Sequence, residues 1–201
     1  MRPEEMLHSG ELYRSNDPAL VNRQQQYIEL VCDYNLTRPS EAEKRQELLR
    51  RMFAEVGEGC WIEPPFHANF GGHFCHLGRG VYVNFNLTLV DDTHIYIGDR
   101  TFIGPNVTLA TASHPFDPAL RAEGYQSNSP IRIGRDCWLG AGVIVLPGVT
   151  IGDNVVIGAG SVVTHDIPSD SVAVGVPCRV IRHNPAHPDG PASAGEKAEH
   201  C

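Results

Sequence analysis

The stretch Ile133–Thr164 reads IGRDCWLGAGVIVLPGVTIGDNVVIGAGSVVT, and it decides the fold. An aliphatic residue recurs in it at every sixth position: Ile133, Leu139, Val145, Ile151, Ile157 and Val163. Glycine follows several of these pivots: Gly134, Gly140, Gly152 and Gly158. A period of six is neither helical nor the alternation of an ordinary strand, and it is typical of a short strand and turn that form one flat side of a coil. The sequence therefore predicts a parallel β-helix, although the pattern does not give its hand.

The same register extends toward the N-terminus. The pivots continue, with one slip of two residues in the middle, at Leu77, Val83, Leu89, Ile97, Ile103 and Leu109. Four residues after a pivot, a second aliphatic set is expected to face inward: Val81, Leu87, Val107, Val143, Val149 and Val155. Gly, Asp and Asn after the pivots, as in Gly98-Asp99 and Gly152-Asp153-Asn154, are expected to adopt the corner conformations, in which φ can be positive.

The two ends of the repeat region are expected to carry caps, because a stack of coils leaves open strand edges only there. Apolar residues at helical spacing predict two amphipathic helices within residues 1–60. Asn16 or Asp17 precedes a proline and suits the N-cap of the first helix. Ser40–Glu43 reads as a capping box for the second helix, and Gly57 as its C-terminal stop. The segment around Pro177 is expected to cap the other end.

The chain divides into one domain with two appendages. Its 201 residues, 41% of them hydrophobic, suffice for one well-buried core. We expect a helical segment over residues 1–60 and the β-helix over 61–182, with a protruding loop at about 110–130. Residues 183–201, HNPAHPDGPASAGEKAEHC, hold almost no bulky apolar side chains and are expected to form a mobile tail.

Charge and cysteine usage exclude several classes of partner. A net charge of −8 lacks the basic surface that nucleic acid or an anionic membrane requires. No apolar run is long enough to span a bilayer, and the start MRPEEMLHSG has no signal-peptide core, so a cytoplasmic location is expected. The six cysteines form no CxxC pair, which argues against a disulfide framework or a zinc knuckle.

A polar excursion interrupts the repeat at Ala110–Gly134, ATASHPFDPALRAEGYQSNSPIRIG. From Leu109 to Ile133 is 24 residues, so the six-residue register survives although the inward aliphatics disappear. The chain is therefore expected to leave the coil as a loop, and loops on rigid scaffolds commonly carry functional groups. Position alone leaves His114 open as either a surface residue or a general base.

The repeat, VNFNLTLVDD at Val83–Asp92, TASHPFD at Thr111–Asp117 and VPCRVIR at Val176–Arg182 together resemble the hexapeptide-repeat acetyltransferases, specifically the maltose and galactoside O-acetyltransferase group. The resemblance covers residues 4 to 182. It implies a left-handed parallel β-helix, a homotrimer with active sites between subunits, and transfer of acetyl from acetyl-CoA to a sugar hydroxyl, maltose/glucose-like or galactoside-like. GELYRSND at Gly10–Asp17 resembles the maltose branch more than the galactoside branch.

By this resemblance His114 is the general base. A sugar hydroxyl is a poor nucleophile at neutral pH, and an imidazole, which titrates near pH 7, suits removal of its proton during attack on the thioester. The transfer is expected to be direct, because no cysteine lies in a motif for covalent catalysis. Asn84 is implied to hold the reacting hydroxyl or to support the tetrahedral charge.

The resemblance also implies binding residues. The acceptor side comprises Asp92, Asn69, Ser15 and Asp17, although from the residues alone Asp92 and Asn84 read equally well as corner residues. The acetyl-CoA side comprises Trp138, Ala141, Ala159, Thr164, His165, Arg179 and Arg182. The small side chains let the pantetheine arm lie against the backbone, and the two arginines suit phosphates. The family usually reads VTKDIP where this chain has His165 in place of the lysine.

Two other classes of function stay open. His76, His94 and His114 fall on successive coils and could converge between subunits, as in a metal-dependent γ-carbonic-anhydrase-like enzyme. The chain could also be a non-catalytic scaffold. A nearby cluster, His67, His73, Cys75 and His76, does not match a known zinc spacing, so no metal site is expected there. The His114 loop together with Asn84, Thr164 and the paired arginines favours the acetyltransferase.

Overall fold

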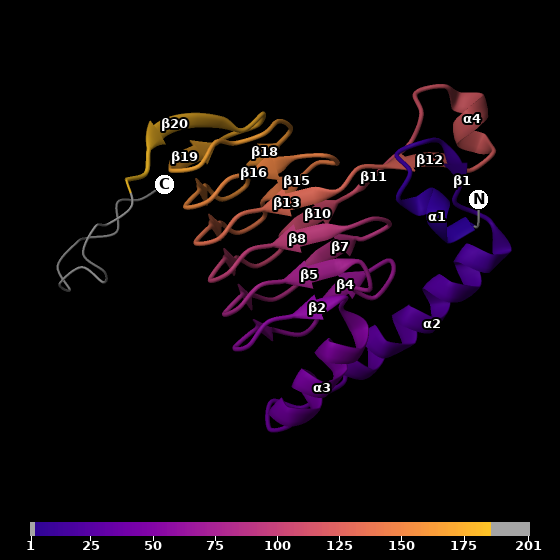
Figure 1. The fold of residues 1–201 in the computed structure, drawn as a ribbon, viewed down its shortest axis with the longest axis horizontal. Coiled ribbons are helices and arrows are strands. Elements are labelled where there is room, and N and C mark those ends of the chain that lie inside the picture. Colours follow the sequence, from indigo (N-terminus) through magenta and orange to yellow (C-terminus); the bar gives the residue numbers. More distant parts are fainter. Residues whose placement is uncertain (1–2, 186–201) are drawn as a thin grey trace.

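A computed structural model describes residues 3–185, which form an N-terminal helical segment followed by a solenoid of about six turns (Figure 1). Each complete turn gives one strand to each of three parallel sheets, so the solenoid is a three-faced prism. The expected left-handed parallel β-helix is confirmed.

The three sheets run along the three faces of the prism. The first holds β2 (Glu55–Val56), β5 (Cys75–Leu77), β8 (Ile95–Ile97), β13 (Ile131–Ile133) and β16 (Thr150–Ile151). The second holds β3 (Trp61–Ile62), β6 (Tyr82–Val83), β9 (Phe102–Ile103), β14 (Trp138–Leu139), β17 (Val156–Ile157), β19 (Ser171–Val174) and β20 (Arg179–His183). The third holds β4 (His67–Ala68), β7 (Thr88–Val90), β10 (Thr108–Ala110), β15 (Ile144–Val145) and β18 (Val162–Val163).

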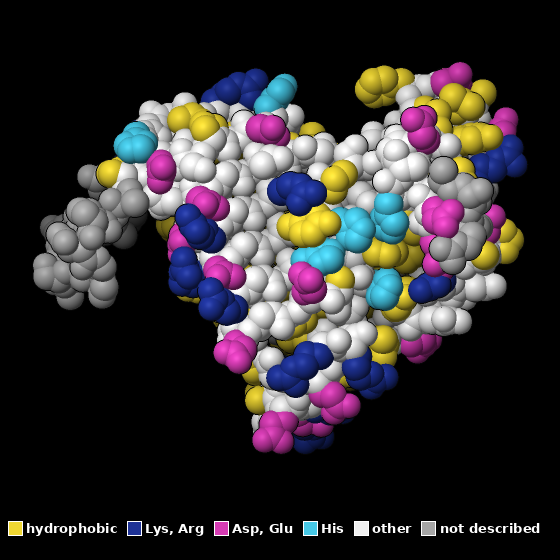
Figure 2. All heavy atoms as spheres, in the orientation of Figure 1, with side chains coloured by type: hydrophobic (Ala, Val, Ile, Leu, Met, Phe, Trp, Pro, Cys, Tyr) yellow, Lys and Arg dark blue, Asp and Glu magenta, His cyan; other side chains and the backbone are white. Residues whose placement is uncertain are grey.

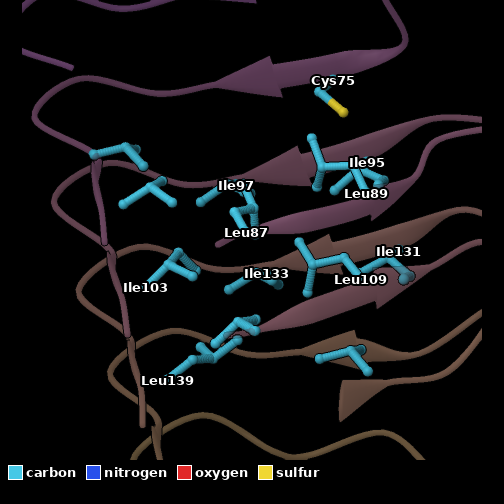
Figure 3. Packing of buried hydrophobic residues seen from close by; sticks show 14 of the residues in the cluster. Cys75, Leu87, Leu89, Ile95, Ile97, Ile103, Leu109, Ile131, Ile133 and Leu139 are labelled. Carbon is cyan, nitrogen blue, oxygen red and sulfur yellow. The ribbon is translucent and has the colours of Figure 1, made fainter. Parts of the chain in front are cut away.

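The core is a column of aliphatic side chains inside the prism, as the six-residue period predicts (Figure 3). Both inward sets are buried, and the parallel register places like positions above one another; for example, Leu109 pairs with Leu89 on one side and Val145 on the other. Complete burial of one such side chain contributes about 1.5–3 kcal/mol, so the stack supplies most of the stabilisation.

The corners differ in detail from the expectation. Positive φ occurs three residues after the pivot, as at Arg100 (55°) and Asn154 (53°), and the residue directly after the pivot does not adopt it. Glycine is required after the pivot for another reason. A Cβ on Gly98 would lie 2.5 Å from the backbone nitrogen of Arg135 in the next turn. Close stacking of turns therefore selects Gly98, whereas backbone conformation selects Asn154.

Within the described residues three helices precede the solenoid, one more than expected: α1 (Pro3–Leu7), α2 (Pro18–Asn35) and α3 (Ala42–Met52). Asp17 caps α2, because its carboxylate accepts a hydrogen bond of 2.8 Å from the Ala19 amide. The capping box predicted at Ser40–Glu43 is wrong. Glu41 is the N-cap of α3, and its side chain instead accepts from the Arg38 amide in the preceding turn.

The solenoid begins before residue 60. Helix α3 ends at Met52, and Gly57, predicted as the helix stop, donates its N–H to the Leu77 carbonyl as part of the first turn. The helices close this end of the core as expected, because the Tyr34 hydroxyl of α2 donates to the Ile62 carbonyl at 2.6 Å.

At the other end, β19 and β20 form an antiparallel hairpin that contains Pro177 and covers the last turn. The first residues of the predicted 183–201 tail are ordered, since Asn184 Nδ2 donates to the Asn154 carbonyl at 3.0 Å. The tail from residue 186 onward lies outside the described residues. Within residues 3–185 no helix is long and apolar enough to cross a membrane, and the cytoplasmic location stays a prediction.

Candidate active site

The polar excursion leaves the prism at one edge and meets the N-terminal segment. It forms β11 (Ala112–Ser113), the short helix α4 (Pro118–Ala122) and β12 (Tyr125–Asn128), and it protrudes from the stack as expected (Figure 1). Strand β12 lies between β11 and β1 (Tyr13–Arg14), antiparallel to both. The N-terminal segment and the loop therefore form one small sheet beside the solenoid.

His114 follows β11 and its side chain is exposed. Its Nδ1 lies 3.0 Å from the Tyr125 carbonyl oxygen. A carbonyl oxygen only accepts hydrogen bonds, so Nδ1 carries the proton and Nε2 of the neutral ring carries the lone pair. The ring is thus fixed in the tautomer and orientation that a general base needs.

Three of the predicted acceptor residues, Ser15, Asn69 and Asp92, line one pocket of about 140 Å³. Asp92 is buried, and its Oδ2 accepts from Asn69 Nδ2 at 2.9 Å. The repeat register slips by two residues before Ile97 because the chain bends between β7 and β8. Asp92 lies in this bend. The neighbouring Asp91 holds the Asn69 loop, because its carboxylate accepts from the Phe70 and Gly72 amides, both at 2.8 Å.

Several residues of this pocket escaped the sequence analysis, and two of them, Tyr13 and Gln126, form hydrogen bonds within it. Tyr13 and Gln126 both line it, and Gln126 Nε2 donates to Asp92 Oδ1 at 2.9 Å. Burial raises the pKa of Tyr13 to about 12, so its phenol stays neutral at physiological pH. Neither residue lies in a repeat. They lie side by side next to Asp92 because β1 and β12 form an antiparallel pair in which Tyr13 is opposite Gln126.

Ser15 and Asp17, the two alternatives for the N-terminal acceptor group, lie on different sides. Ser15 lines the Asp92 pocket, and its hydroxyl donates to the Gly124 carbonyl at 3.0 Å. Asp17 caps α2 and lines a separate, more apolar pocket of about 370 Å³ with Tyr13 and Tyr125. The geometry therefore groups Ser15, and not Asp17, with Asp92.

Asn84 lies at a different edge of the prism from His114. It follows β6, at the corner between the second and third sheets, whereas His114 projects from the corner after β10, between the third and first. Asn84 Oδ1 accepts from the Phe85 amide at 2.8 Å. A single chain therefore does not bring the two predicted catalytic residues together.

The predicted acetyl-CoA residues divide between the same two edges and the last turn. Ala141 and Ala159 are exposed at the Asn84 edge, with the Gly160 amide donating to the Ala141 carbonyl at 2.8 Å, and Trp138 is exposed on the adjoining face. Thr164 and His165 hydrogen bond to each other at 2.8 Å at the His114 edge. A pocket of about 470 Å³ brings His165 together with Arg179 of β20, while Arg182 lies opposite Val172 in the hairpin.

The buried cysteine thiols in the described part of the chain do not support covalent catalysis. Among the described residues Cys60, Cys75, Cys137 and Cys178 are buried. Burial raises the pKa of each of these thiols, that of Cys137 to about 11, so none is poised as a nucleophilic thiolate.

The four residues of the His67–His76 cluster point in different directions. Cys75 lies in the core, His73 stacks on Tyr27 with ring centroids 4.3 Å apart, and exposed His67 belongs to another face of the prism. His76 approaches His94 at 3.0 Å, whereas His114 bonds to the Tyr125 carbonyl instead. No group of three metal-ligating side chains that could hold an ion is found among residues 3–185.

Comparison with known proteins identifies the family. Residues 7–57 match the maltose acetyltransferase hexapeptide capping motif, and residues 130–165 match the bacterial transferase hexapeptide of six repeats. A galactoside O-acetyltransferase of Lactococcus lactis subsp. lactis is 54% identical over 88% of this chain and 85% of its own. The chain belongs to the hexapeptide-repeat acetyltransferases.

Solved structures agree with this assignment. A maltose O-acetyltransferase from Clostridium difficile superposes with a TM-score of 0.90 at 43% identity, covering 92% of this chain and 99% of its own. A galactoside acetyltransferase in complex with coenzyme A has a TM-score of 0.88 at 47% identity, covering 92% of each chain. These likenesses confirm the expected enzyme class, an O-acetyltransferase with acetyl-CoA as its cosubstrate.

Proposed function

We propose that this enzyme transfers an acetyl group from acetyl-CoA to a sugar hydroxyl, with His114 as the general base. The observation that carries the proposal is the hydrogen bond from His114 Nδ1 to the Tyr125 carbonyl, because in the neutral ring it assigns the proton to Nδ1 and the lone pair to Nε2. The acceptor hydroxyl attacks the thioester carbon as Nε2 takes its proton. When the carbon–sulfur bond breaks, Nε2 donates this proton to the sulfur of the departing coenzyme A.

The acceptor is proposed to be a sugar of the maltose/glucose or galactoside kind, bound in the pocket of Ser15, Asn69 and Asp92. The carboxylate of Asp92 retains lone pairs for sugar hydroxyls, which supports this reading. Relatives named for maltose and for galactosides have similar identities, so both acceptors belong in the first assay.

We further propose a homotrimer with active sites between subunits. The placement of Asn84 and His114 at different prism edges supports it, because a neighbouring copy related by cyclic symmetry can bring one edge against the other. Acetyl-CoA is then proposed to lie between these edges, against the following residues: Trp138, Ala141, Ala159, Thr164, His165, Arg179 and Arg182.

The test is release of coenzyme A thiol from acetyl-CoA with maltose, glucose and galactosides as acceptors. We expect His114→Ala to lower kcat by about 10²- to 10⁴-fold with little change in the KM for acetyl-CoA, since a general base acts in the transition state. His67→Ala, another exposed histidine, is the matched control and should retain activity. Near wild-type kcat in the His114 variant would remove this residue from the mechanism.

A further inference from the structure

Three polar side chains, one from β1 and two from β12, meet beside the acceptor pocket. Tyr13 of β1 lies opposite Gln126 in the antiparallel pair, and Asn128, two residues further along β12, faces the same side. Their exposed fractions are 2%, 5% and 3%. Buried polar groups are costly unless they have partners, so the partners of these groups define what the pocket presents to a ligand.

The amide of Gln126 has one chemically allowed orientation. Its Nε2 lies among three oxygens: Asp92 Oδ1 at 2.9 Å, Asn128 Oδ1 at 3.2 Å and the Tyr13 hydroxyl. An ionised carboxylate only accepts hydrogen bonds, so the nitrogen and not the oxygen of the amide must face Asp92. The amide oxygen, Oε1, is therefore the end that is turned away from the carboxylate.

That amide oxygen is left for a ligand. Within the described part of the chain Gln126 Oε1 accepts no hydrogen bond, and no fully buried polar side-chain atom there lacks a partner. Oε1 is therefore not fully buried, and we place its open side in the acceptor pocket because Gln126 lines that pocket. Asn128 holds the network in place, since its Nδ2 donates to the Tyr13 hydroxyl at 2.9 Å and to the Leu7 carbonyl at 3.0 Å.

Asp92 is oriented by the same network. Its Oδ1 accepts from Gln126 and its Oδ2 from Asn69, and each carboxylate oxygen has a further lone pair. The pocket thus offers two fixed acceptor groups side by side. We propose that Gln126 is a specificity-determining residue that, together with Asp92, accepts hydrogen bonds from two hydroxyls on adjacent carbons of the acceptor. This inference rests on the proposed function and names what its pocket selects, a sugar with a free vicinal diol.

The experiment compares acceptors that differ by one hydroxyl. The probes are the methyl glycosides of glucose and galactose and their monodeoxy analogues, with kcat/KM measured by thiol release at saturating acetyl-CoA. The wild-type enzyme should lose about 10-fold or more for each of two adjacent hydroxyls removed, because a buried acceptor is then left without a partner. A loss confined to a single hydroxyl overturns the inference without any variant.

Gln126→Met keeps the length of the side chain and removes both polar atoms. We expect the kcat/KM values of this variant for the parent sugar and for one deoxy analogue to agree within about 2-fold. The variant lacks the amide oxygen that accepts from the hydroxyl missing in that analogue. Gln25→Met is the matched control, since Gln25 is exposed on α2 and does not line this pocket, and it should keep the wild-type preference.

The alternative, a purely structural role for Gln126, has a different signature. It lowers kcat/KM for all acceptors by the same factor and leaves the preference between parent and deoxy sugars unchanged, and that result overturns the inference. Failure of the proposed function is recognised separately, because the wild-type enzyme would then acetylate no sugar in the series.

Discussion

At the scale of single residues, the candidate site depends on side chains whose orientation is set by backbone groups. His114 donates to the Tyr125 carbonyl, and Asp91 accepts from two backbone amides of the loop that carries Asn69. Burial raises the pKa of Asp91 to about 7 although both amides favour its charged form. The backbone thus fixes both the proposed base and the acceptor loop before any substrate binds.

His165 carries the first prediction, because the family usually has lysine at this position. We expect the KM for acetyl-CoA to rise by roughly two- to five-fold between about pH 6 and about pH 8.5, and to rise less in His165→Lys, since the ammonium of the variant keeps its positive charge throughout this range. The phosphate of coenzyme A titrates near pH 6 in both proteins, so the variant is the control. Parallel curves would leave Arg179 and Arg182 as the phosphate ligands.

The sequence predicts site residues where a motif carries them, as for Asp92, Asn69 and Ser15, which share one pocket. Tyr13 and Gln126 could not be predicted in this way. They are 113 residues apart, and nothing in either local sequence indicates that their side chains meet. Such a contact depends on how the N-terminal strand pairs with the loop, which no local pattern encodes.

At the scale of elements, a histidine cluster anchors the N-terminal segment to the solenoid. Figure 2 shows histidine side chains gathered on one face, between the stacked turns and the N-terminal part of the chain. His8 Nδ1 lies 2.8 Å from Thr93 Oγ1, and its ring lies 4.6 Å from that of His94, which in turn approaches His76 at 3.0 Å. The Leu7 carbonyl beside His8 accepts from Asn128, so the cluster supports one wall of the acceptor pocket.

This cluster predicts a loss of stability in mild acid. Burial, aided by the repulsion of neighbouring positive groups such as Arg132, lowers the pKa of His8, His73 and His94 below the ordinary value of 6.5. Below that value the unfolded chain binds more protons than the folded one, so stability is complete above about pH 6.5 and falls as pH decreases through the lowered pKa values. The urea midpoint of the wild type should therefore fall more steeply toward pH 5 than that of His94→Gln. Equal slopes would show that His94 does not contribute.

Elements were predicted well where their signal is periodic. Each turn repeats one local rule, so the register, the inward residues and the protruding loop follow from the sequence. Helix starts are less regular. Ser40 and Glu43 match a capping box, but the Glu41 side chain bonds to the Arg38 amide instead, a competition that propensity alone does not decide.

At the scale of the whole molecule, the three-edged prism places the predicted site residues on two separate edges. One edge carries Asn84, Ala141 and Ala159, and the next carries His114 and Thr164. These two edges bound the same face, so one chain cannot fold either of them onto the other. Assembly of copies around a threefold axis offers a route by which two such edges can meet.

The most direct test of this account is complementation between two inactive variants. His114→Ala and Asn84→Ala chains, each inactive alone, are mixed, unfolded and refolded together, and thiol release from acetyl-CoA is measured. Sites shared between subunits should recover about a quarter of wild-type activity in an equal mixture, since a site needs an intact His114 from one chain and an intact Asn84 from its neighbour. A mixture as inactive as its two components would place both residues in the site of a single chain and contradict the account.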